Sequence, residues 1–463
     1  ITGDRSVTPC FNTFYEFVKP IRFISDLKLR ASYGLAGNNR IGNDLWHNIY
    51  RVYSGTSAPA FGNEEYNYYQ FADQTYLYDP DLKWETTITR NIGLDFGFFR
   101  NRLSGTVDVY WNTTKDLLVP SIIPNSSGYS RQMTNVGQTS NKGVEISLDA
   151  KIIQTKDFQL SANFNVAFNK NKVDKLATGE TEWKTKASLS NWYGTYNYKM
   201  EVGKSMGLIY GFVNDGFYKV DDFDFDATTK KWTLKPGIPD NSSFSSGNFA
   251  FKPGAMKFKK LSDSESNLIT EDDMTVIGDT NPKVTGGFGL SGNWKNLDFT
   301  AFFNYMCDFD VLNVNKLYLH SAVRRNYSNL STDMNLANRF RYVDDAGVNV
   351  SSDPVALAAL NENAKTYSWM SVTQGITMTD LVEDGSFLRL STLTVGYTLP
   401  KHWLRSLGVK SLRLYFSGSN LFTITGYSGY DPEVNIQKGL TPGIDNNVTP
   451  RSRVYTVGVN LNF

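Results

Sequence analysis

The sequence predicts an all-β protein, a transmembrane antiparallel β-barrel region of about eleven strands. Three observations favour this class. Apolar and polar residues alternate over segments long enough to cross a bilayer as tilted strands. Short and long connections between these segments also alternate along the chain. Aromatic residues make up 14% of the sequence and charged residues only 20%, which is low for a soluble domain.

Charge and hydropathy narrow the classes of function. The 463 residues carry a formal net charge of +1, and the mean hydropathy is −0.36. This near balance of charge argues against a nucleic-acid-binding protein. No apolar run approaches the ~18–20 residues that a membrane helix needs. The first residues, ITGDRSVTPC, lack the basic and apolar segments of an export signal, so if the protein is exported its signal lies elsewhere.

The strands follow from the alternation, element by element. In FQLSANFNVAF (158–168), Phe164, Val166 and Phe168 share one face, whereas Asn163 and Asn165 share the other. Similar patterns predict strands near 5–15, 26–36, 86–99, 103–115, 142–153, 157–170, 283–293, 296–306, 385–398, 410–420 and 452–463.

The connections between the predicted strands fall into two groups. Short ones are expected around 16–25, 100–102, 155–157, 294–295 and 399–410. Long ones are expected near 37–85, 116–141, 171–282, 307–384 and 421–451. Outer-membrane barrels have short periplasmic turns and long extracellular loops, so this segregation favours a barrel over a soluble sandwich or propeller. The alternation of apolar and polar residues does not by itself distinguish a barrel from a soluble sandwich or propeller, because any half-buried antiparallel sheet shows it.

The last stretch, RSRVYTVGVNLNF (451–463), predicts a strand with one apolar face. That face carries Tyr455, Val457, Val459, Leu461 and Phe463. An aromatic residue at the end of the last strand is the mark that outer-membrane assembly machinery reads. Phe463 is therefore predicted to be an assembly signal.

Five stretches carry a family resemblance: LKLRASYGLAGN (27–38), the run from LKWETTITRN to TTKDLL (82–118), NVGQTSNKGVEISLDA (135–150), DGSFLRLSTLTVGYTLP (384–400) and LRLYFSGSNLFTITGYSGYDPEVN (412–435). In this order they resemble the SusC/RagA family of TonB-dependent outer-membrane transporters. The segment RSVTPCFNTFYEF (5–17) fits the family poorly, which indicates a divergent strand or a junction there.

The resemblance implies that residues 1–463 are the C-terminal half of a barrel of about 22 strands, with the plug domain absent from this chain. It implies active import of an oligomeric nutrient, a glycan or a peptide, driven by TonB through the plug. The implied partners are the N-terminal half with its plug, a SusD-like surface lipoprotein and outer-membrane lipid. The implied location is the cell outer membrane of a Gram-negative bacterium, crossed many times.

About eleven strands are expected not to close on themselves, because an odd number of antiparallel strands brings parallel neighbours to the seam. If the sheet stays open, each unpaired strand edge is costly in lipid. The missing half should therefore pair with 5–15 and 452–463. Two other classes remain open: a passive porin or secretion barrel, and a soluble glycan-binding β-protein. A soluble protein would purify without detergent, and a porin would conduct ions without TonB.

No catalytic residue is predicted, and the chain is not expected to be an enzyme. His47, His320 and His402 are scattered, without the spacing of a zinc site. Cys10 and Cys307 are far apart and could be free or paired. The only candidate cofactor is calcium, in the acidic stretch DSESNLITEDDM (263–274). Its candidate ligands are Asp263, Glu265, Asn267 and Glu271.

The calcium site is a weak prediction, because Leu268 and Met274 occupy the positions where an EF-type loop needs Gly and Glu. Aromatic residues in the long loops are the better candidates for ligand binding, since sugars and peptides pack on aromatic faces. They are Trp183, Trp192, Tyr193, Tyr196, Tyr367 and Trp369. The alternative is loop packing or an interfacial girdle, to which Tyr427 and Tyr430 are assigned.

Overall fold

The computed structural model describes residues 5–7, 10–11, 23–38, 50–53, 69–72, 76–129, 131–176, 180–187, 189, 196–244, 251–320, 329–369, 375–405, 408–433 and 439–463. These form two compact units. Unit 1 comprises Ile1–Trp183 with Glu201–Ser205, and unit 2 comprises Lys184–Met200 with Met206–Phe463. Within the described residues, no helix is both long and apolar enough to cross a membrane.

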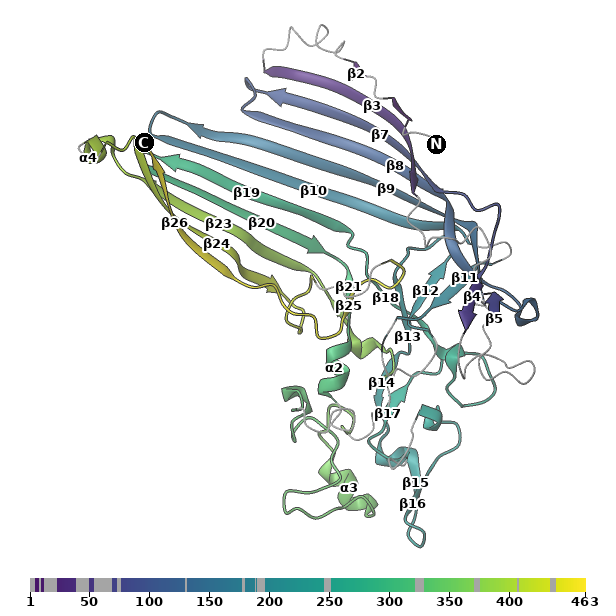
Figure 1. Cartoon of the computed structure of the whole chain (residues 1–463). Coiled ribbons are helices and arrows are strands. Elements are labelled where there is room, and N and C mark those ends of the chain that lie inside the picture. Colours follow the sequence, from purple (N-terminus) through teal and green to yellow (C-terminus); the bar gives the residue numbers. More distant parts are fainter. Residues whose placement is uncertain are drawn as a thin grey trace. The chain divides into compact units, whose positions relative to one another are not determined.

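Unit 1 is built on an antiparallel sheet of long strands (Figure 1). Its order is β1 (Arg5–Val7), β3 (Ile24–Asn38), β7 (Glu85–Phe98), β8 (Leu103–Ile122), β9 (Arg131–Gln154) and β10 (Phe158–Lys175). Two short strands join this sheet: β2 (Cys10–Phe11) pairs with β3, and β6 (Tyr76–Leu77) pairs with β9. A separate two-stranded sheet is formed by β4 (Tyr50–Tyr53) and β5 (Tyr69–Ala72).

Unit 2 contains a second run of antiparallel long strands (Figure 1). Their order is β19 (Val284–Trp294), β20 (Leu297–Cys307), β23 (Phe387–Thr398), β24 (Ser411–Thr425) and β26 (Val454–Asn462). Among the described strands, β26 pairs only with β24. Cys307, at the end of β20, carries a free thiol; the side chain of Cys10 lies outside the described residues.

Every segment predicted as a strand contains one, but the loop predicted at 116–141 is wrong at both ends. The hairpin continues, with β8 and β9 paired as far as Ile122 and Arg131. The register shifts near Asp116, which has a positive φ of 56°. A bulge of this kind interrupts the alternation without ending the strand, so the sequence pattern placed the end of the strand too early.

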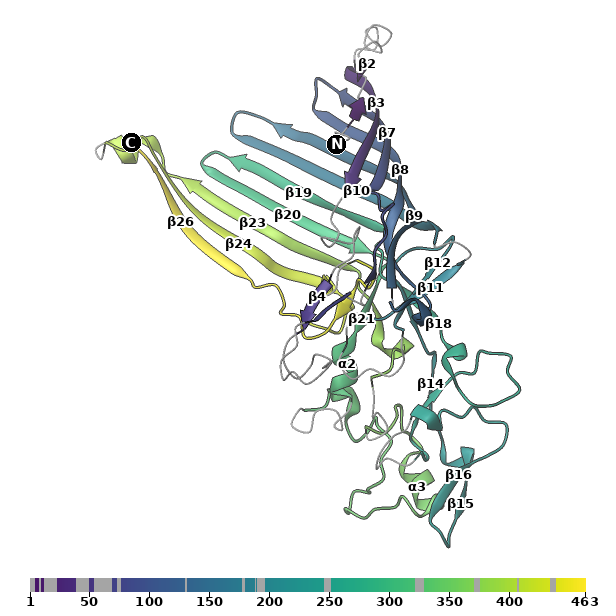
Figure 2. The same cartoon turned by 45° about the vertical axis from the view of Figure 1, so that its right-hand side comes forward.

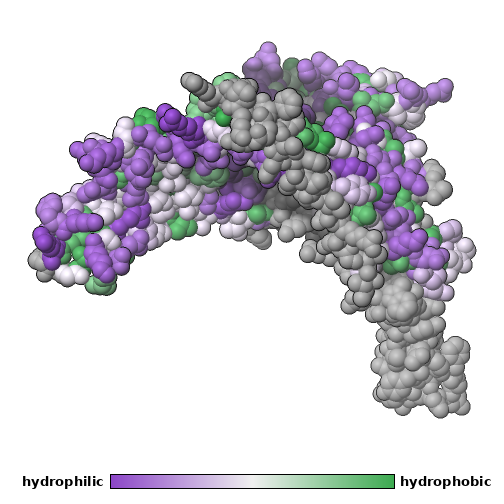
Figure 3. Space-filling model, turned by 90° about the horizontal axis from the view of Figure 1, so that it is seen from above, coloured by the Kyte–Doolittle hydropathy of each residue, from purple (hydrophilic) through white to green (hydrophobic). Residues whose placement is uncertain are grey.

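Alternation produces two chemically different faces in each run of strands. Large apolar side chains on one face are exposed, including Ile92, Leu94 and Trp111 in unit 1 and Leu414 in unit 2. This is the face predicted to meet lipid. In the view of Figure 3, hydrophilic residues predominate over the described surface, with apolar patches between them.

On the polar face, long side chains cross a glycine to reach a strand beyond it. The Arg30 guanidinium lies 2.8 Å from Asp95 and 3.1 Å from Asp108, and it passes over Gly93 of the strand between. In unit 2, Arg413 passes over Gly396 and donates to Asp298 at 2.9 Å. A Cβ at either glycine would collide with the arginine side chain.

Unit 2 also contains a loop region outside its long strands (Figure 2). Its sheets use β13 (Leu208–Gly211), β14 (Asn214–Phe217), β15 (Phe223–Asp226), β16 (Lys231–Leu234), β17 (Met256–Phe258), β18 (Thr275–Asp279), β21 (Asp310–Asn313), β22 (Val382–Asp384) and β25 (Ile444–Asp445). Its helices include α2 (Val314–Leu319) and α3 (Pro354–Leu360). Another helix of unit 2, α4 (Lys401–Leu404), connects β23 to β24 at the opposite end of the long strands (Figure 1). The boundary between the units falls within β11 (Glu182–Thr185) and β12 (Tyr198–Glu201).

The loop region has its own apolar core. Fully buried members come from distant parts of the chain, among them Ile209, Leu312, Leu317, Met378 and Ile444. This core is what fixes β21, α2 and β22 against one another. It therefore positions the polar side chains that these elements carry.

Candidate ligand-binding pocket

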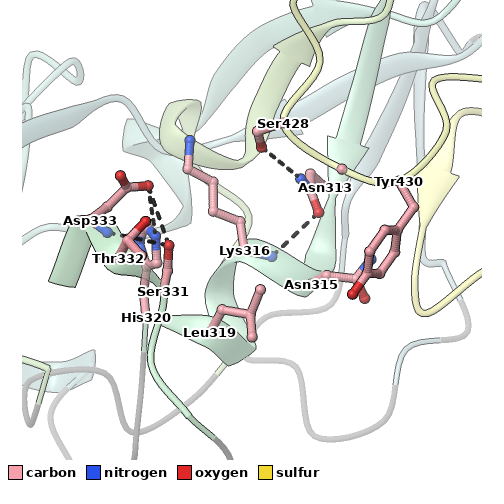
Figure 4. A pocket seen from close by; sticks show the side chains of 11 residues that line it. Asn313, Asn315, Lys316, Leu319, His320, Ser331, Thr332, Asp333, Ser428 and Tyr430 are labelled. Atoms are coloured by element: carbon pink, nitrogen blue, oxygen red, sulfur yellow. Dashed lines mark hydrogen bonds and ion pairs between the residues drawn. The ribbon is translucent and has the colours of Figure 1, made fainter. Parts of the chain in front are cut away.

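A pocket of about 340 Å³ lies in the loop region of unit 2 (Figure 4). Three chain segments line it: the end of β21 with α2, the turn at 331–333, and the turn at 428–430. The lining residues are Asn313, Asn315, Lys316, Leu319, His320, Ser331, Thr332, Asp333, Ser428, Gly429 and Tyr430. Its volume is in the range of small-ligand sites.

The helix α2 forms one wall of the pocket because its two faces differ. Val314 and Leu317 are fully buried in the core, whereas Lys316 and Leu319 line the pocket. The Asn313 side chain caps the helix by accepting a hydrogen bond from the Lys316 amide at 3.3 Å. Such a cap satisfies one of the donors that a helix N-terminus leaves open.

Glu383, in β22, compensates the positive charge of this wall. Its carboxylate lies 3.4 Å from Lys316 Nζ and accepts hydrogen bonds from the amide and hydroxyl of Ser428 at 2.9 and 2.8 Å. Burial raises the pKa of Glu383, but the Ser428 donors and the Lys316 ammonium outweigh it, so the pKa is lowered. The lysine is therefore already paired.

A buried carboxylate holds the turn that carries Tyr430. Asp445 accepts hydrogen bonds at 2.8 Å from both Asn315 Nδ2 and the Tyr427 hydroxyl. Burial and the Asp445 charge raise the pKa of Tyr427. Tyr427 is buried against Phe309 and its neighbours, so its assignment to an interfacial girdle is wrong. Tyr430, by contrast, is 85% exposed at the pocket rim.

The opposite end of the pocket is rich in hydrogen-bond acceptors. His320 is 7% exposed, and burial and Lys316 lower its pKa to about 4, so the imidazole is neutral at pH 7. Its Nε2 is buried without a hydrogen bond to any described residue and lies 3.9 Å from Asp333 Oδ2. Its Nδ1 lies 3.4 Å from the hydroxyl of Tyr367. The Asp333 side chain is 72% exposed.

The described aromatic candidates do not line this pocket. Tyr367 is 2% exposed within the loop core, and Trp369 is partly buried against the same core, with Arg339 at 5.8 Å from its ring. Tyr196 is half-buried in unit 2 and Trp183 half-buried in unit 1. Trp192 and Tyr193 lie outside the described residues. Ligand binding by this set stays a prediction, although Tyr367 offers no exposed ring face here.

The calcium candidates are all exposed: Asp263, Glu265, Asn267 and Glu271. Across the described part of the chain, no group of three or more His, Cys, Asp or Glu side chains is arranged to hold a metal. The acidic stretch is organised instead by Asp273, which sequence reasoning missed. Its carboxylate accepts backbone hydrogen bonds from Leu261, Ser262 and Thr270 at 2.8–2.9 Å and pairs with Lys260 at 3.1 Å.

The signal for Asp273 was present in the sequence as a capping box, Thr270 followed three residues later by an acid. Phe463, the predicted assembly signal, follows β26 and is exposed, as are Val459 and Leu461 on the same face. Its role stays a prediction.

Comparison with known proteins places most of the chain in one family. The family "TonB dependent receptor-like, beta-barrel" matches residues 2–421. The TonB-dependent receptor P3 of Formosa agariphila is 31% identical over 453 residues, which cover 96% of this chain and 40% of that protein. TonB-dependent receptor SusC of Bacteroides thetaiotaomicron is 29% identical over 459 residues, which cover 96% of this chain and 38% of that protein.

Solved structures agree with these sequence matches. The RagAB peptide transporter aligns with a TM-score of 0.71 and 26% identity, covering 99% of this chain and 43% of that chain. The same importer in a closed-closed state aligns with a TM-score of 0.72. The chain thus spans about two fifths of the length of the relatives that it matches.

Proposed function

The chain belongs to the TonB-dependent receptor β-barrel family of the outer membrane, a family of transporters rather than enzymes, and we propose that the protein containing it imports an oligomeric nutrient. The observation that carries this proposal is the family match over residues 2–421. It confirms the resemblance to SusC and RagA stated from the sequence. Because this chain spans only part of its relatives, activity, substrate and partners belong to the proposal.

We propose a peptide as the substrate in preference to a glycan. The structural relatives at 25–26% identity are described as a peptide transporter or importer. A glycan, the other oligomer that the sequence resemblance implies, is the second candidate. A passive porin or secretion barrel is disfavoured, because the relatives are TonB-dependent receptors.

We propose the assembly that the resemblance to SusC and RagA implies. A SusD-like lipoprotein covers the loop region, and the N-terminal half supplies the plug, through which TonB acts. The remaining barrel strands pair with the edge strands of this chain. The long loops predicted near 171–282 and 307–384 support this, because connections of such length commonly serve binding.

Uptake measurements test the function. Cells that produce the intact protein are given labelled peptides or labelled oligosaccharides, with and without TonB. We expect peptide uptake that is lost without TonB and lost when the protein is deleted. Uptake that persists without TonB would instead support a passive pore.

A further inference from the structure

We propose that the pocket at α2 binds a primary ammonium group, the free N-terminus of a peptide, with Asp333 as its charge partner. This inference rests on the proposed import function and narrows its substrate to peptides with an unblocked amino end. It concerns the residues that line one pocket of unit 2 (Figure 4).

The charges of the pocket favour a cation. Lys316 is compensated by Glu383 at 3.4 Å, and this carboxylate is further held by Ser428. Asp333 has no such compensation: its nearest basic side chain among the described residues is His320, which is neutral at pH 7. Counted over the described side chains, the pocket together with Glu383 therefore carries one surplus negative charge, which attracts a cation and repels a peptide carboxylate.

The two acceptors at this end have a spacing that suits one nitrogen. Asp333 Oδ2 and His320 Nε2 lie 3.9 Å apart, too far for a hydrogen bond to each other. A single nitrogen above their midpoint can lie at about 2.9 Å from both. A bound ammonium favours the imidazole tautomer with its proton on Nδ1, toward Tyr367, which leaves Nε2 as an acceptor.

The buried histidine supplies the second, independent indication of a ligand. A buried polar atom without a hydrogen bond carries a desolvation cost, and such atoms are rare in native proteins. His320 Nε2 is one of five buried side-chain atoms in this state among the described residues. The hydroxyls of Ser331 and Thr332 stand beside it and add acceptor oxygens.

The size and shape of the pocket limit how much of a peptide can enter it. About 340 Å³ accommodates one or two residues of a peptide but not a long oligomer. Leu319 and the exposed ring of Tyr430 supply an apolar wall for the first side chain. The rest of the substrate would extend out of the pocket past Tyr430.

The test compares two peptide pools that differ only at the amino end. The intact protein, purified in detergent, is incubated at pH 7 with random hexapeptides lacking Lys, Arg and His, or with the same pool after N-acetylation. Retained peptides are counted by mass spectrometry. We expect the free pool to be retained about 10- to 100-fold more strongly, as a hydrogen-bonded charge pair would give.

Variants assign the effect to the pocket. Asp333→Asn removes the charge and should bring the retention ratio of the two pools close to one. Asp224→Asn is the matched control, because that carboxylate is 71% exposed against 72% for Asp333 but lies in β15, away from the pocket. The control should keep the wild-type ratio.

Three results would overturn the proposal: equal retention of both pools by the unmodified protein, retention of neither pool, or an unchanged ratio in Asp333→Asn. Binding of maltohexaose in place of peptides would identify a glycan site. The import function is judged separately, since TonB-dependent uptake of any oligomer would survive each of these results. Uptake unaffected by TonB would remove the import function itself.

Discussion

Single glycines set the geometry of the polar face of the long strands. Gly93 lies between Arg30 and Asp108 in the strand register, and only the absence of its side chain lets the two meet at 3.1 Å. The same relation recurs at Gly143, where Tyr110 crosses to Asn169 at 2.9 Å. Long polar side chains covering strand glycines thus join alternate strands on this face.

We expect Gly93→Val to destabilise the barrel by about 1–3 kcal/mol, because the branched side chain displaces Arg30 and leaves Asp108 without its partner. Urea titration of the protein in lipid vesicles, followed by gel mobility, measures the free energy of unfolding. Gly426→Val is the control, since a Cβ there would meet no described atom within 4 Å. Equal stability of the Gly93 and Gly426 variants would contradict this role.

Asp273 organises the acidic loop through hydrogen bonds and an ion pair. Its side chain is 0% exposed. Burial raises the pKa of Asp273, but the Ser262, Thr270 and Leu261 amides and Lys260 more than offset this and lower the pKa to about 2. The loop contacts are therefore fully formed above the ordinary aspartate pKa of 3.8 and weaken as pH falls through about 2.

Asp273→Ala should destabilise this loop by about 1–3 kcal/mol, because it leaves buried donors unpaired. Hydrogen exchange at the amides of Leu261, Ser262 and Thr270 reports the change, and we expect their protection to fall. In the unmodified protein the same protection should hold from pH 7 to 4 and decline below 4. Calcium at millimolar concentration should not restore protection in the variant; restoration would favour the calcium site after all.

The turn between β7 and β8 shows how a short connection joins two long strands into a hairpin. Phe99, Arg100 and Asn101 all adopt positive φ, of 54°, 60° and 56°. Each non-glycine residue in this region costs roughly 1–2 kcal/mol, least for Asn. The pairing of β7 with β8 outweighs this cost, and the left-handed backbone conformation of the three residues makes the turn tight.

Replacing Arg100 with Gly should therefore stabilise the hairpin by about 1 kcal/mol, whereas Arg100→Val should destabilise it by a similar amount or more. The midpoint of urea unfolding should move in opposite directions for the two variants. Movement of both midpoints in the same direction would show that the lost arginine side chain, rather than the backbone conformation, controls the turn.

At the scale of the whole molecule, the unpaired edge of the last strand determines whether the chain needs further strands to form a barrel. One side of β26 pairs with β24 over the nine residues Val454–Asn462, and no described strand pairs with its other side. Each backbone group left unsatisfied in lipid costs several kcal/mol. Further strands are required to cover this edge.

We predict that the chain produced alone does not form a barrel that resists SDS without heating. Co-production with the N-terminal part of the parent protein should restore that resistance, because the added strands pair with the open edge of β26. The heat-dependent shift in gel mobility measures both states. A resistant barrel from this chain alone would show that it closes on itself.

Most of the strands could be placed from the sequence, because a period of two is a local property that each segment displays in its own residues. The misplaced end of β8 at Asp116 shows the limit: a bulge breaks the alternation but not the pairing. The burial of Tyr367 could not be predicted from the sequence either. An aromatic residue in a polar loop suits an exposed ligand platform and a small core alike.

The pocket depends on contacts that no local pattern encodes. Asn313 and Ser428, hydrogen-bonded at 3.4 Å, are separated by 115 positions, and Asn313 and Glu383 by 70. In the sequence His320 is only one of three scattered histidines, because its lowered pKa arises from burial among segments that are distant along the chain. Strand faces follow from local alternation, whereas the acceptor pair of His320 and Asp333 exists only because that core brings α2 and the 331–333 turn together.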